Sequence, residues 1–303
     1  MNRKKLSKLR REWEQMWRSP QKASGPFGPE LQAEACRALE AGRVLFLPLL
    51  AFQIAAAEHD LLDPTSAGTA RKNVSVDPGT GAIGNAALAG GDAARLQGMM
   101  ARFADGAASL VRGLVPGYAA ALARGRTSFR PLEIAGRDYS PRHDDRRLHV
   151  DAFPSRPQKG GRILRLFTNV ARDGAARRWQ VGEPFPDFAR RFAGRIGRPP
   201  AGSAWFLERC GITKGRRSLY DHVMLNLHDR AKLDGGYQRA APKFDLAFPA
   251  GSTWLCFTDQ VLHAALGGHG ALEQTFYLPV AALAEPATAP LRVLERMLDR
   301  PLV

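Results

Sequence analysis

The chain of 303 residues is long enough for one large domain or two small ones, and its 45% hydrophobic and 24% charged residues are typical of a globular protein, not of a disordered or collagenous one. Three scattered cysteines, Cys36, Cys210 and Cys256, indicate neither a disulfide framework nor a thiolate zinc site. The 44 basic and 29 acidic residues give a net charge of +15, which predicts an anionic partner: a nucleic acid, a lipid surface or an acidic small molecule.

The first 18 residues have the pattern of a basic amphipathic helix. Placed on a helix, one face carries Leu6, Leu9, Trp13, Met16 and Trp17, and lysine and arginine cover the rest. Such a helix lies on an anionic membrane or packs its tryptophan side against the domain, and the two interpretations are compatible. A serine-proline pair ends it, so the sequence is expected to divide into a helix at 1–18 and a single domain at 19–303.

Nothing in the sequence predicts a membrane span or secretion. The longest apolar stretch, residues 44–57, is interrupted by Pro48 and Gln53 and is shorter than the roughly 20 residues that a spanning helix needs. The basic N-terminus has no apolar region of the kind found in signal peptides. Because the cysteines also fit a reducing compartment, we expect a cytoplasmic protein.

The remaining elements are predicted in chain order from their hydrophobic periodicity and turn signals. The first half predicts a helix at 31–41, strands at 44–52 and 71–81, and a long helical stretch at 92–122 that Gly113 and Pro116 interrupt. The second half predicts strands at 128–134, 146–153, 162–171, 177–182, 244–252, 253–259 and 273–280, with helices near 187–192 and 222–234. Most gaps between strands are too short for crossover helices. The pattern therefore favours an α+β protein with a double-stranded β-helix, a jelly roll of the cupin-like kind, flanked by helices.

A candidate metal site begins at His149-Val150-Asp151. In a strand, side chains alternate, so His149 and Asp151 are expected on one face. A third ligand from a late strand, for which His263 is the candidate, would complete the two-histidine, one-carboxylate triad that leaves open positions on Fe(II). The order of these residues in a jelly roll is that of an Fe(II)/2-oxoglutarate dioxygenase. The alternative is a half-exposed strand histidine paired with Asp151.

The other histidines give weaker signals. His222 and His228 are rival metal ligands, but six residues apart on a helix they lie on different faces, so packing or hydrogen bonding within the helix is favoured. His143, in the loop PRHDD, either contacts substrate or is a surface residue.

An enzyme of this class needs a cation for the far carboxylate of 2-oxoglutarate, and arginine suits a carboxylate best. No lysine or arginine lies between His263 and Arg292, and Gln274 stands where the cation is expected. The strand at 162–171 offers Arg162 and Arg165 on opposite faces. We favour Arg165, because its face also carries Phe167 and Asn169. The predicted cosubstrate-binding residues are therefore Arg165, Asn169, Gln274 and Arg162.

Four segments carry a resemblance to a known family: RRLHVDAFPSRPQKGGRILRLFTNV, RRWQVGEPF, YDHVMLNLHD and FPAGSTWLCFTDQVLHAALGGHGALEQTFYLPV. Over roughly residues 42–280 the chain resembles the Kdo hydroxylases, Fe(II)/2-oxoglutarate dioxygenases of Gram-negative bacteria that act on 3-deoxy-D-manno-oct-2-ulosonic acid, Kdo. The resemblance implies hydroxylation of Kdo at C3 in the lipopolysaccharide inner core, with Fe(II) held by His149, Asp151 and His263. It also implies 2-oxoglutarate and O₂ as cosubstrates. The missing cation after His263 departs from the wider superfamily.

The resemblance also implies the partners. Kdo carries a carboxylate and lipid A carries phosphates, so a Kdo-containing lipid A precursor on the inner leaflet suits a chain of charge +15. The predicted substrate-binding residues are Arg147, two residues before His149, together with Lys72 and His143. The expected location is the cytoplasm, peripheral on the anionic inner face of the inner membrane. No protein partner is inferred.

Two alternatives remain at this point. One is a dioxygenase with the same metal core that acts on a different anionic substrate, such as a nucleic acid or a protein side chain. The other is a nucleic-acid-binding protein, which only the arginine excess suggests. The chain has no zinc-finger, helix-turn-helix or RNA-recognition motif, and no aromatic residues interleave with its basic runs, so no specific nucleic-acid partner is expected.

Overall fold

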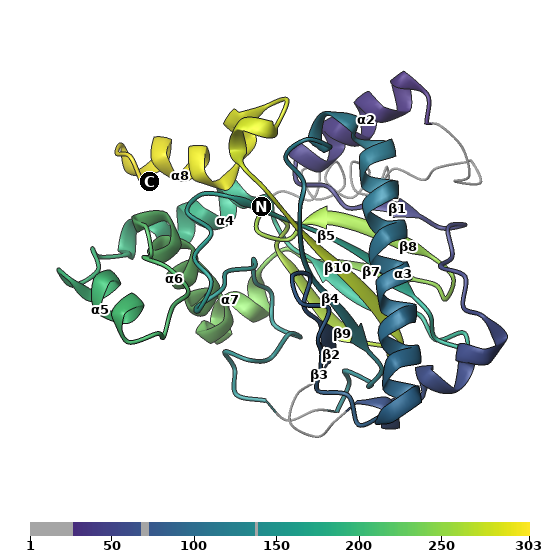
Figure 1. Cartoon of the computed structure of the whole chain (residues 1–303). Helices are drawn as coiled ribbons and strands as arrows, with labels where there is room; N and C mark the ends of the chain where they lie inside the picture. Colours follow the sequence, from purple (N-terminus) through teal and green to yellow (C-terminus); the bar gives the residue numbers. More distant parts are fainter. Residues whose placement is uncertain (1–26, 68–72, 137–138) are drawn as a thin grey trace.

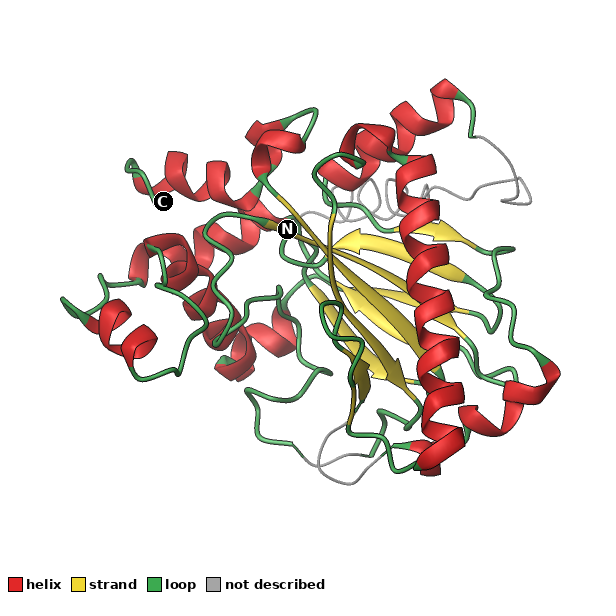
Figure 2. Ribbon diagram, in the orientation of Figure 1, coloured by secondary structure: helices red, strands yellow, loops and turns green. Residues whose placement is uncertain are grey.

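Two antiparallel β-sheets form the centre of the structure, a computed structural model that describes residues 27–67, 73–136 and 139–303. The predicted helix at 1–18 and the candidate Lys72 lie outside the described residues. Helices cover one face of the sheets and gather in a second group beside them (Figures 1 and 2). The arrangement is that of an α+β protein.

The larger sheet has seven strands. In spatial order they are β1 (Leu45–Leu47), β8 (Thr253–Phe257), β5 (Arg162–Asn169), β10 (Ala271–Leu278), β4 (Ala123–Arg130), β2 (Val74–Val76) and β3 (Ile83–Gly84). The central pair, β5 and β10, is in register over its full length, from Asn169 opposite Ala271 to Arg162 opposite Leu278. Strand β5 is therefore fixed on both sides, which fixes the direction of each of its side chains.

The smaller sheet has three strands, in the order β7 (Phe244–Phe248), β6 (Arg177–Val181) and β9 (His263–Gly267). Aromatic side chains fill the space between the two sheets. The ring of Trp254 on β8 stacks on Phe248 of β7 at 4.1 Å and meets the edge of Trp179 of β6 at 5.7 Å between centroids. Full burial of such rings contributes a few kcal/mol each, so this cluster holds the sheets together.

Alternation along the strands separates this aromatic cluster from the main core. On β8, Trp254 and Cys256 face the smaller sheet, whereas Leu255 and Phe257 belong to the core on the other side. On β5, Leu164 and Leu166 likewise join the main core. Both faces of the larger sheet are thus apolar near its middle, which explains the nearly continuous hydrophobic sequence of β8.

Two helices, α2 (Pro29–Glu40) and α3 (Gly90–Leu114), cover the outer face of the larger sheet (Figure 1). The second group contains α4 (Phe185–Phe192), α5 (Ser203–Arg209), α6 (Leu219–Leu233), α7 (Gly235–Ala240) and α8 (Pro290–Leu298). Short 3₁₀ helices span Ala56–Leu62, Pro64–Ser66, Pro116–Tyr118, Ala193–Arg195, Val280–Ala282 and Pro286–Thr288. Within the described parts of the chain, no helix is both long and apolar enough to cross a membrane.

Most predicted elements lie near their expected positions, and the exceptions have physical reasons. The strand predicted at 146–153 is wrong: this segment forms only an isolated bridge between His149 and His263. The strand predicted at 128–134 lies earlier, as β4, because Pro131 has no N–H to continue the ladder. Pro48 similarly limits the predicted strand at 44–52 to β1. The sequence analysis missed α5, α7, α8 and β3, and it expected a late strand at His263, where β9 lies, without giving its bounds.

One fully buried ion pair ties the start of β5 to the turn between β8 and β9. The Arg162 Nε donates to Asp259 Oδ2 at 2.7 Å, and Arg162 Nη2 donates to Gln260 Oε1 at 2.6 Å. The Ile163 N–H also donates to Asp259 Oδ1 at 3.2 Å. Burial raises the pKa of Asp259 even though Arg162 opposes the shift. The carboxylate therefore depends on the guanidinium for its charge.

Replacing this guanidinium should destabilise the fold strongly. We expect Arg162→Met to lower the free energy of unfolding by about 3–5 kcal/mol, because it leaves Asp259 buried without its counter-ion. The matched control is Arg190→Met, which removes an exposed pair with Asp187 at a similar separation, 2.8 Å, and should cost less than about 1 kcal/mol. Urea denaturation measures both. Equal losses in the two variants would contradict a structural role for the buried pair.

Candidate metal centre and its pocket

His149, Asp151 and His263 form a buried cluster with the spacing of a metal site. Each residue offers one ligand atom, and these atoms all lie within 4.8 Å of one another. The backbone sets the spacing: the His149 N–H donates to the His263 carbonyl at 3.0 Å, and the His263 N–H donates to the His149 carbonyl at 2.9 Å. The Asp151 N–H donates to the carbonyl of Thr258 at 2.8 Å, which holds the carboxylate beside the two rings.

Both imidazole rings are oriented by backbone carbonyls. The Nδ1 of His149 lies 2.7 Å from the carbonyl of Arg147, and the Nδ1 of His263 lies 2.8 Å from the carbonyl of Val261. A carbonyl accepts only, so each Nδ1 carries the proton and each Nε2 keeps its lone pair for a ligand bond. Burial lowers the pKa of both histidines, and their mutual proximity lowers that of His149 further. Both rings are therefore neutral near pH 7, as ligation requires.

The carboxylate of Asp151 is kept ionised by its neighbours. Burial would raise its pKa, but Arg165, and then His263, outweigh burial and hold the pKa below its usual value. The Arg165 Nη1 lies 3.2 Å from Asp151 Oδ2, while Asp151 Oδ1 faces His149 Nε2 at 3.9 Å. Buried Oδ2 accepts no hydrogen bond among the described residues. Two neutral imidazole nitrogens and one carboxylate on one side fit the facial triad of non-haem Fe(II).

A chain of alternating charges supports Arg165 from behind. Glu273 on β10 lies between two arginines: its Oε1 is 3.4 Å from Arg165 Nε, and its Oε2 is 2.5 Å from Arg130 Nη2. Burial would raise the pKa of Glu273, but Arg130 and Arg165 hold it below its usual value. The order Arg130, Glu273, Arg165, Asp151 gives every buried charge an opposite neighbour. Such pairing is the condition under which buried charges are tolerated.

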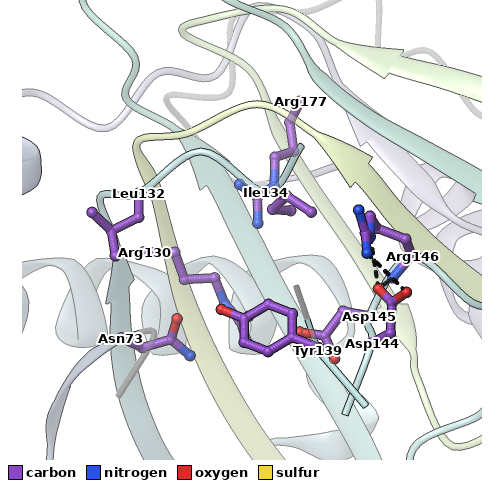
Figure 3. Close-up of a pocket in the computed structure, with 9 residues that line it drawn as sticks. All are labelled: Asn73, Arg130, Leu132, Ile134, Tyr139, Asp144, Asp145, Arg146 and Arg177. Atoms are coloured by element: carbon purple, nitrogen blue, oxygen red, sulfur yellow. Dashed lines mark hydrogen bonds and ion pairs between the residues drawn. The ribbon is translucent and has the colours of Figure 1, made fainter. Parts of the chain in front are cut away.

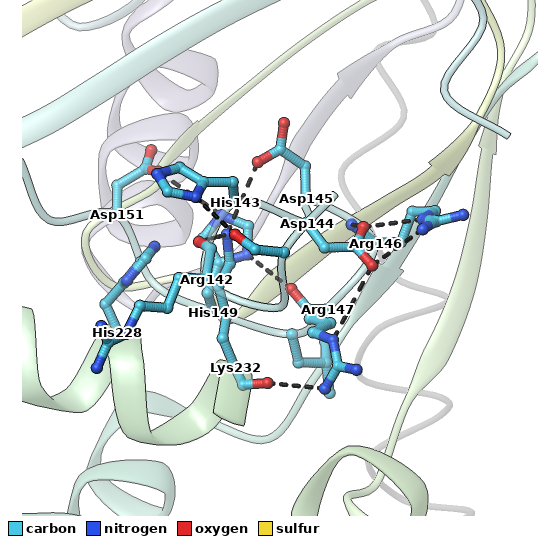
Figure 4. A network of polar contacts seen from close by, with 12 residues as sticks. Arg142, His143, Asp144, Asp145, Arg146, Arg147, His149, Asp151, His228 and Lys232 are labelled. Carbon is cyan, nitrogen blue, oxygen red and sulfur yellow. Dashed lines mark hydrogen bonds and ion pairs between the residues drawn. The ribbon is translucent and has the colours of Figure 1, made fainter. Parts of the chain in front are cut away.

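The triad lies in a pocket of about 430 Å³. Its cations are Arg130, Arg142, Arg165, Arg177 and Lys232, and its acidic residues are Asp145, Asp151 and Asp229. Part of this wall, including His228 and Lys232 of α6 near His149 and Asp151, is drawn in Figure 4. The excess of positive charge suits a small anionic molecule more than a neutral one. A cavity of this size holds a small ligand rather than a polymer.

A smaller recess adjoins the pocket (Figure 3). It has room for about one water molecule, with a volume of about 20 Å³, and shares Asn73, Arg130, Asp145 and Arg177 with the larger pocket. Near it, Arg146 Nε and Nη2 donate to the two oxygens of Asp144 at 2.8 and 3.1 Å. This fork holds the loop before His149 in place.

The pocket contains two of the predicted binding residues. Arg165 lines it beside Asp151, with its guanidinium 5.4 Å from the ring centroid of Phe153. His143 also lines it, and its Nδ1 lies 2.8 Å from the hydroxyl of Ser140.

Three predicted cosubstrate residues do not line the pocket, as the structure describes it. Arg162 is committed to Asp259 on the far side of β5. The Asn169 amide donates to the carbonyls of Ala175 and Phe248, so it holds a turn. Gln274 accepts from Thr127 at 2.6 Å and faces the opposite side of β10. Alternation explains the position of Gln274: Thr275 pairs with Arg165 and Glu273 with Phe167, so Glu273 shares the face of Arg165, whereas Gln274 pairs with Leu166 on the other face.

The position of Arg147 differs from the one predicted for a substrate-binding residue. Its Nη1 donates to the carbonyl of Lys232 at 2.8 Å, and it does not line the described pocket (Figure 4). Residues 146–151 are not a strand, so the alternation that placed Arg147 and His149 on one face does not apply. The third substrate candidate, Lys72, lies outside the described residues.

Two aromatic contacts of the triad were missed from the sequence. His228 meets the ring of His149 edge to face at 5.3 Å, although it is also bonded to Asp229 within its helix, as expected. Trp179 stacks on His263 at 5.2 Å. Both residues lie in the segments that carry the family resemblance, and that was the signal in the sequence that they belong near the site. His222 does not line the described pocket, and its Nε2 donates to the carbonyl of Gly197 at 3.0 Å.

Comparisons with known proteins agree with this geometry. Residues 24–301 match the family model described as 3-deoxy-D-manno-oct-2-ulosonic acid (Kdo) hydroxylase. The chain is 46% identical to the Kdo hydroxylase KdoO, a non-haem Fe(II)- and α-ketoglutarate-dependent dioxygenase, over 92% of this chain and 94% of that one. The TM-score is 0.89 for its complex with α-ketoglutarate (2-oxoglutarate) and Fe(III), and 0.90 for its cobalt(II) complex.

A third structure of the same relative contains succinate and Fe(III), again at 46% identity, with a TM-score of 0.88 over 92% of this chain and 94% of that one. A search of curated proteins found no match. The family model covers more than nine tenths of the sequence, and the buried triad supplies the ligand set that a non-haem iron enzyme needs. The chain belongs to the Kdo hydroxylase family of Fe(II)/2-oxoglutarate-dependent dioxygenases.

Proposed function

We propose that this dioxygenase hydroxylates C3 of Kdo in the lipopolysaccharide inner core and that its acceptor is a Kdo-containing lipid A precursor. The observation that carries the proposal is the buried triad in a pocket with more cations than acids. That pocket suits two anionic ligands, the cosubstrate 2-oxoglutarate and the carboxylate of the sugar.

We also infer how the chain is organised around this activity. The two antiparallel sheets with the triad between them fit a double-stranded β-helix of the jelly-roll, cupin-like kind. Residues 19–303 then form one dioxygenase domain with helical additions, preceded by the basic segment 1–18. We propose a cytoplasmic enzyme, peripheral on the anionic inner face of the inner membrane, since its lipid-linked acceptor and its charge of +15 both favour that surface.

The three ligand residues would hold the metal from one side. His149 and His263 offer Nε2, and Asp151 offers Oδ1, while the opposite side faces the pocket. When bound there, Fe(II) supplies O₂ activation coupled to decarboxylation of 2-oxoglutarate. The protein contributes orientation: backbone carbonyls fix the imidazole tautomers, and Arg165 restrains the second oxygen of Asp151.

We propose that Arg165 also faces the cosubstrate. It is buried in the pocket wall beside the triad, and Asp151 and Glu273, outweighing burial, raise the pKa of its guanidinium. It is therefore charged under all working conditions. His143 and Arg142 also line the pocket, and we propose both as contacts for the sugar carboxylate.

Mass spectrometry of inner-core sugar tests the reaction and its position together. In a host that lacks the activity, expression of this chain should add the mass of one oxygen atom to Kdo. With Kdo carrying deuterium at C3, the product should lose one deuterium. Retention of both deuterium atoms in an oxygenated product would contradict the position, and unmodified Kdo would contradict the substrate and favour another anionic acceptor.

Removing a triad ligand should abolish turnover. We expect His149→Ala and His263→Ala each to reduce 2-oxoglutarate-dependent succinate formation to background, because two remaining ligands do not hold the metal in the required geometry. The metal content of the purified variants should fall in parallel. His222→Ala, which removes an imidazole outside the pocket, is the control and should retain turnover. Full activity in either triad variant would refute the metal assignment.

Arg165 gives a separable prediction. If Arg165 binds the cosubstrate, Arg165→Met should raise the KM for 2-oxoglutarate by roughly 10- to 100-fold, the equivalent of a charged hydrogen bond of about 1.5–3 kcal/mol. Arg165→Lys should recover part of the affinity, since it keeps the charge without the planar fork. An unchanged KM with a lower kcat would instead show that Arg165 acts only by positioning Asp151.

A further inference from the structure

The helix α5 and the turn after it form an apolar projection. Of the six large hydrophobic side chains that the described residues expose, Trp205, Phe206 and Ile212 lie within this short segment, with exposed fractions of 54%, 57% and 54%. None of the seven residues of α5 is buried. The helix lies at the edge of the molecule, at the left of Figure 1. A cluster of this kind on a protein surface indicates an interaction site.

The same projection is strongly basic. Between residues 195 and 217 there are six basic residues, Arg195, Arg198, Arg209, Lys214, Arg216 and Arg217, and the only acidic residue is Glu208. The Oε2 atom of Glu208 lies 3.6 Å from the Nε atom of Arg216. Exposed aromatic and aliphatic side chains with lysine and arginine close by in the sequence match the surface of an anionic bilayer, where charged headgroups cover an apolar interior. Tryptophan favours the interface, and each cation near the surface contributes roughly 1 kcal/mol.

This projection is attached to the rim of the active-site pocket. The Lys214 N–H donates to the carbonyl of Ser155 at 2.8 Å, and Arg217 Nη2 donates to the carbonyl of Pro154 at 2.5 Å. Pro154 and its neighbour Phe153 line the pocket that contains the triad. The turn after α5 therefore contacts a loop that lines the pocket.

We propose that α5 and residues 210–217 dock this enzyme on an anionic phospholipid bilayer, with Trp205, Phe206 and Ile212 entering the interface. The docking holds the pocket rim at the membrane surface, where the sugar of a lipid-linked acceptor projects. Its consequence for catalysis rests on the proposed function, whereas membrane binding itself does not. The structure supplies the element through which the charge of the chain is directed at a lipid surface.

Vesicle sedimentation tests the docking. The full chain should bind vesicles of phosphatidylglycerol and phosphatidylcholine more strongly than vesicles of phosphatidylcholine alone. Trp205→Ser/Phe206→Ser should weaken binding to the anionic vesicles by about tenfold or more, because two apolar side chains no longer enter the interface. The matched control is Leu49→Ser, at an exposed leucine elsewhere on the surface (68% exposed), which should bind like the unmodified chain.

Three further measurements show whether a change in vesicle binding is due to α5. Thermal unfolding of the double variant should be unchanged, because neither side chain belongs to the core. Quenching of tryptophan emission by brominated lipid should be smaller in Trp205→Phe than in the unmodified chain. Deleting residues 2–18 isolates α5 from the N-terminal segment, and in that background the double substitution should still weaken binding.

Activity measurements then separate the two proposals. The double variant should keep its turnover with a water-soluble Kdo oligosaccharide and lose about tenfold with the same sugar on lipid in anionic vesicles. Absence of vesicle binding by the full chain, or equal binding by the double variant, would overturn the docking whatever the substrate. Vesicle binding that depends on α5, without hydroxylation of Kdo, would leave the docking in place and overturn the proposed function.

Discussion

The geometry of the metal centre depends on one backbone bridge, the reciprocal hydrogen bonds between His149 and His263. These two residues lie far apart in the sequence: His263 begins β9 and pairs with Val181 of β6, whereas His149 lies outside any named strand. The bridge brings two imidazole rings to a centroid separation of 4.6 Å. Because the carbonyls that orient the rings lie two residues before each histidine, the same local backbone geometry sets both the spacing and the tautomer.

Charge pairing is the second constraint. Burial alone would raise the pKa of the Asp151 carboxyl, and the neighbour that most strongly lowers it is Arg165. Arg165 itself is buried, so Glu273 must balance it, and Arg130 must balance Glu273. The series of charge pairs that keeps Asp151 ionised therefore extends across three strands of the larger sheet, β5, β10 and β4. This arrangement fixes the charges before any ligand arrives, which is the basis of electrostatic preorganisation.

The sequence predicted those features that follow from local periodicity. Alternation in β5 correctly separated Arg162 from Arg165, and the triad was found from the His-x-Asp spacing and a late histidine. The predictions were wrong where contacts between distant parts of the chain determine the direction of a side chain. The segment around Arg147 reads as a strand but pairs at one point only, so its side-chain directions do not follow alternation. The contacts of His149 with α6 join residues distant in the chain, and no local pattern encodes them.

The distribution of the positive charge argues for small anions in the pocket. A nucleic-acid backbone requires an extended basic track, because each phosphate contact contributes a modest amount and many are needed. In the described residues, five cations instead line a pocket of about 430 Å³ beside the triad, and six further basic residues lie between 195 and 217, on either side of α5 in the sequence. The first arrangement concentrates positive potential where a dicarboxylate fits. The second places it close in the sequence to tryptophan and phenylalanine side chains, where an anionic lipid surface satisfies both the charge and the apolar contact.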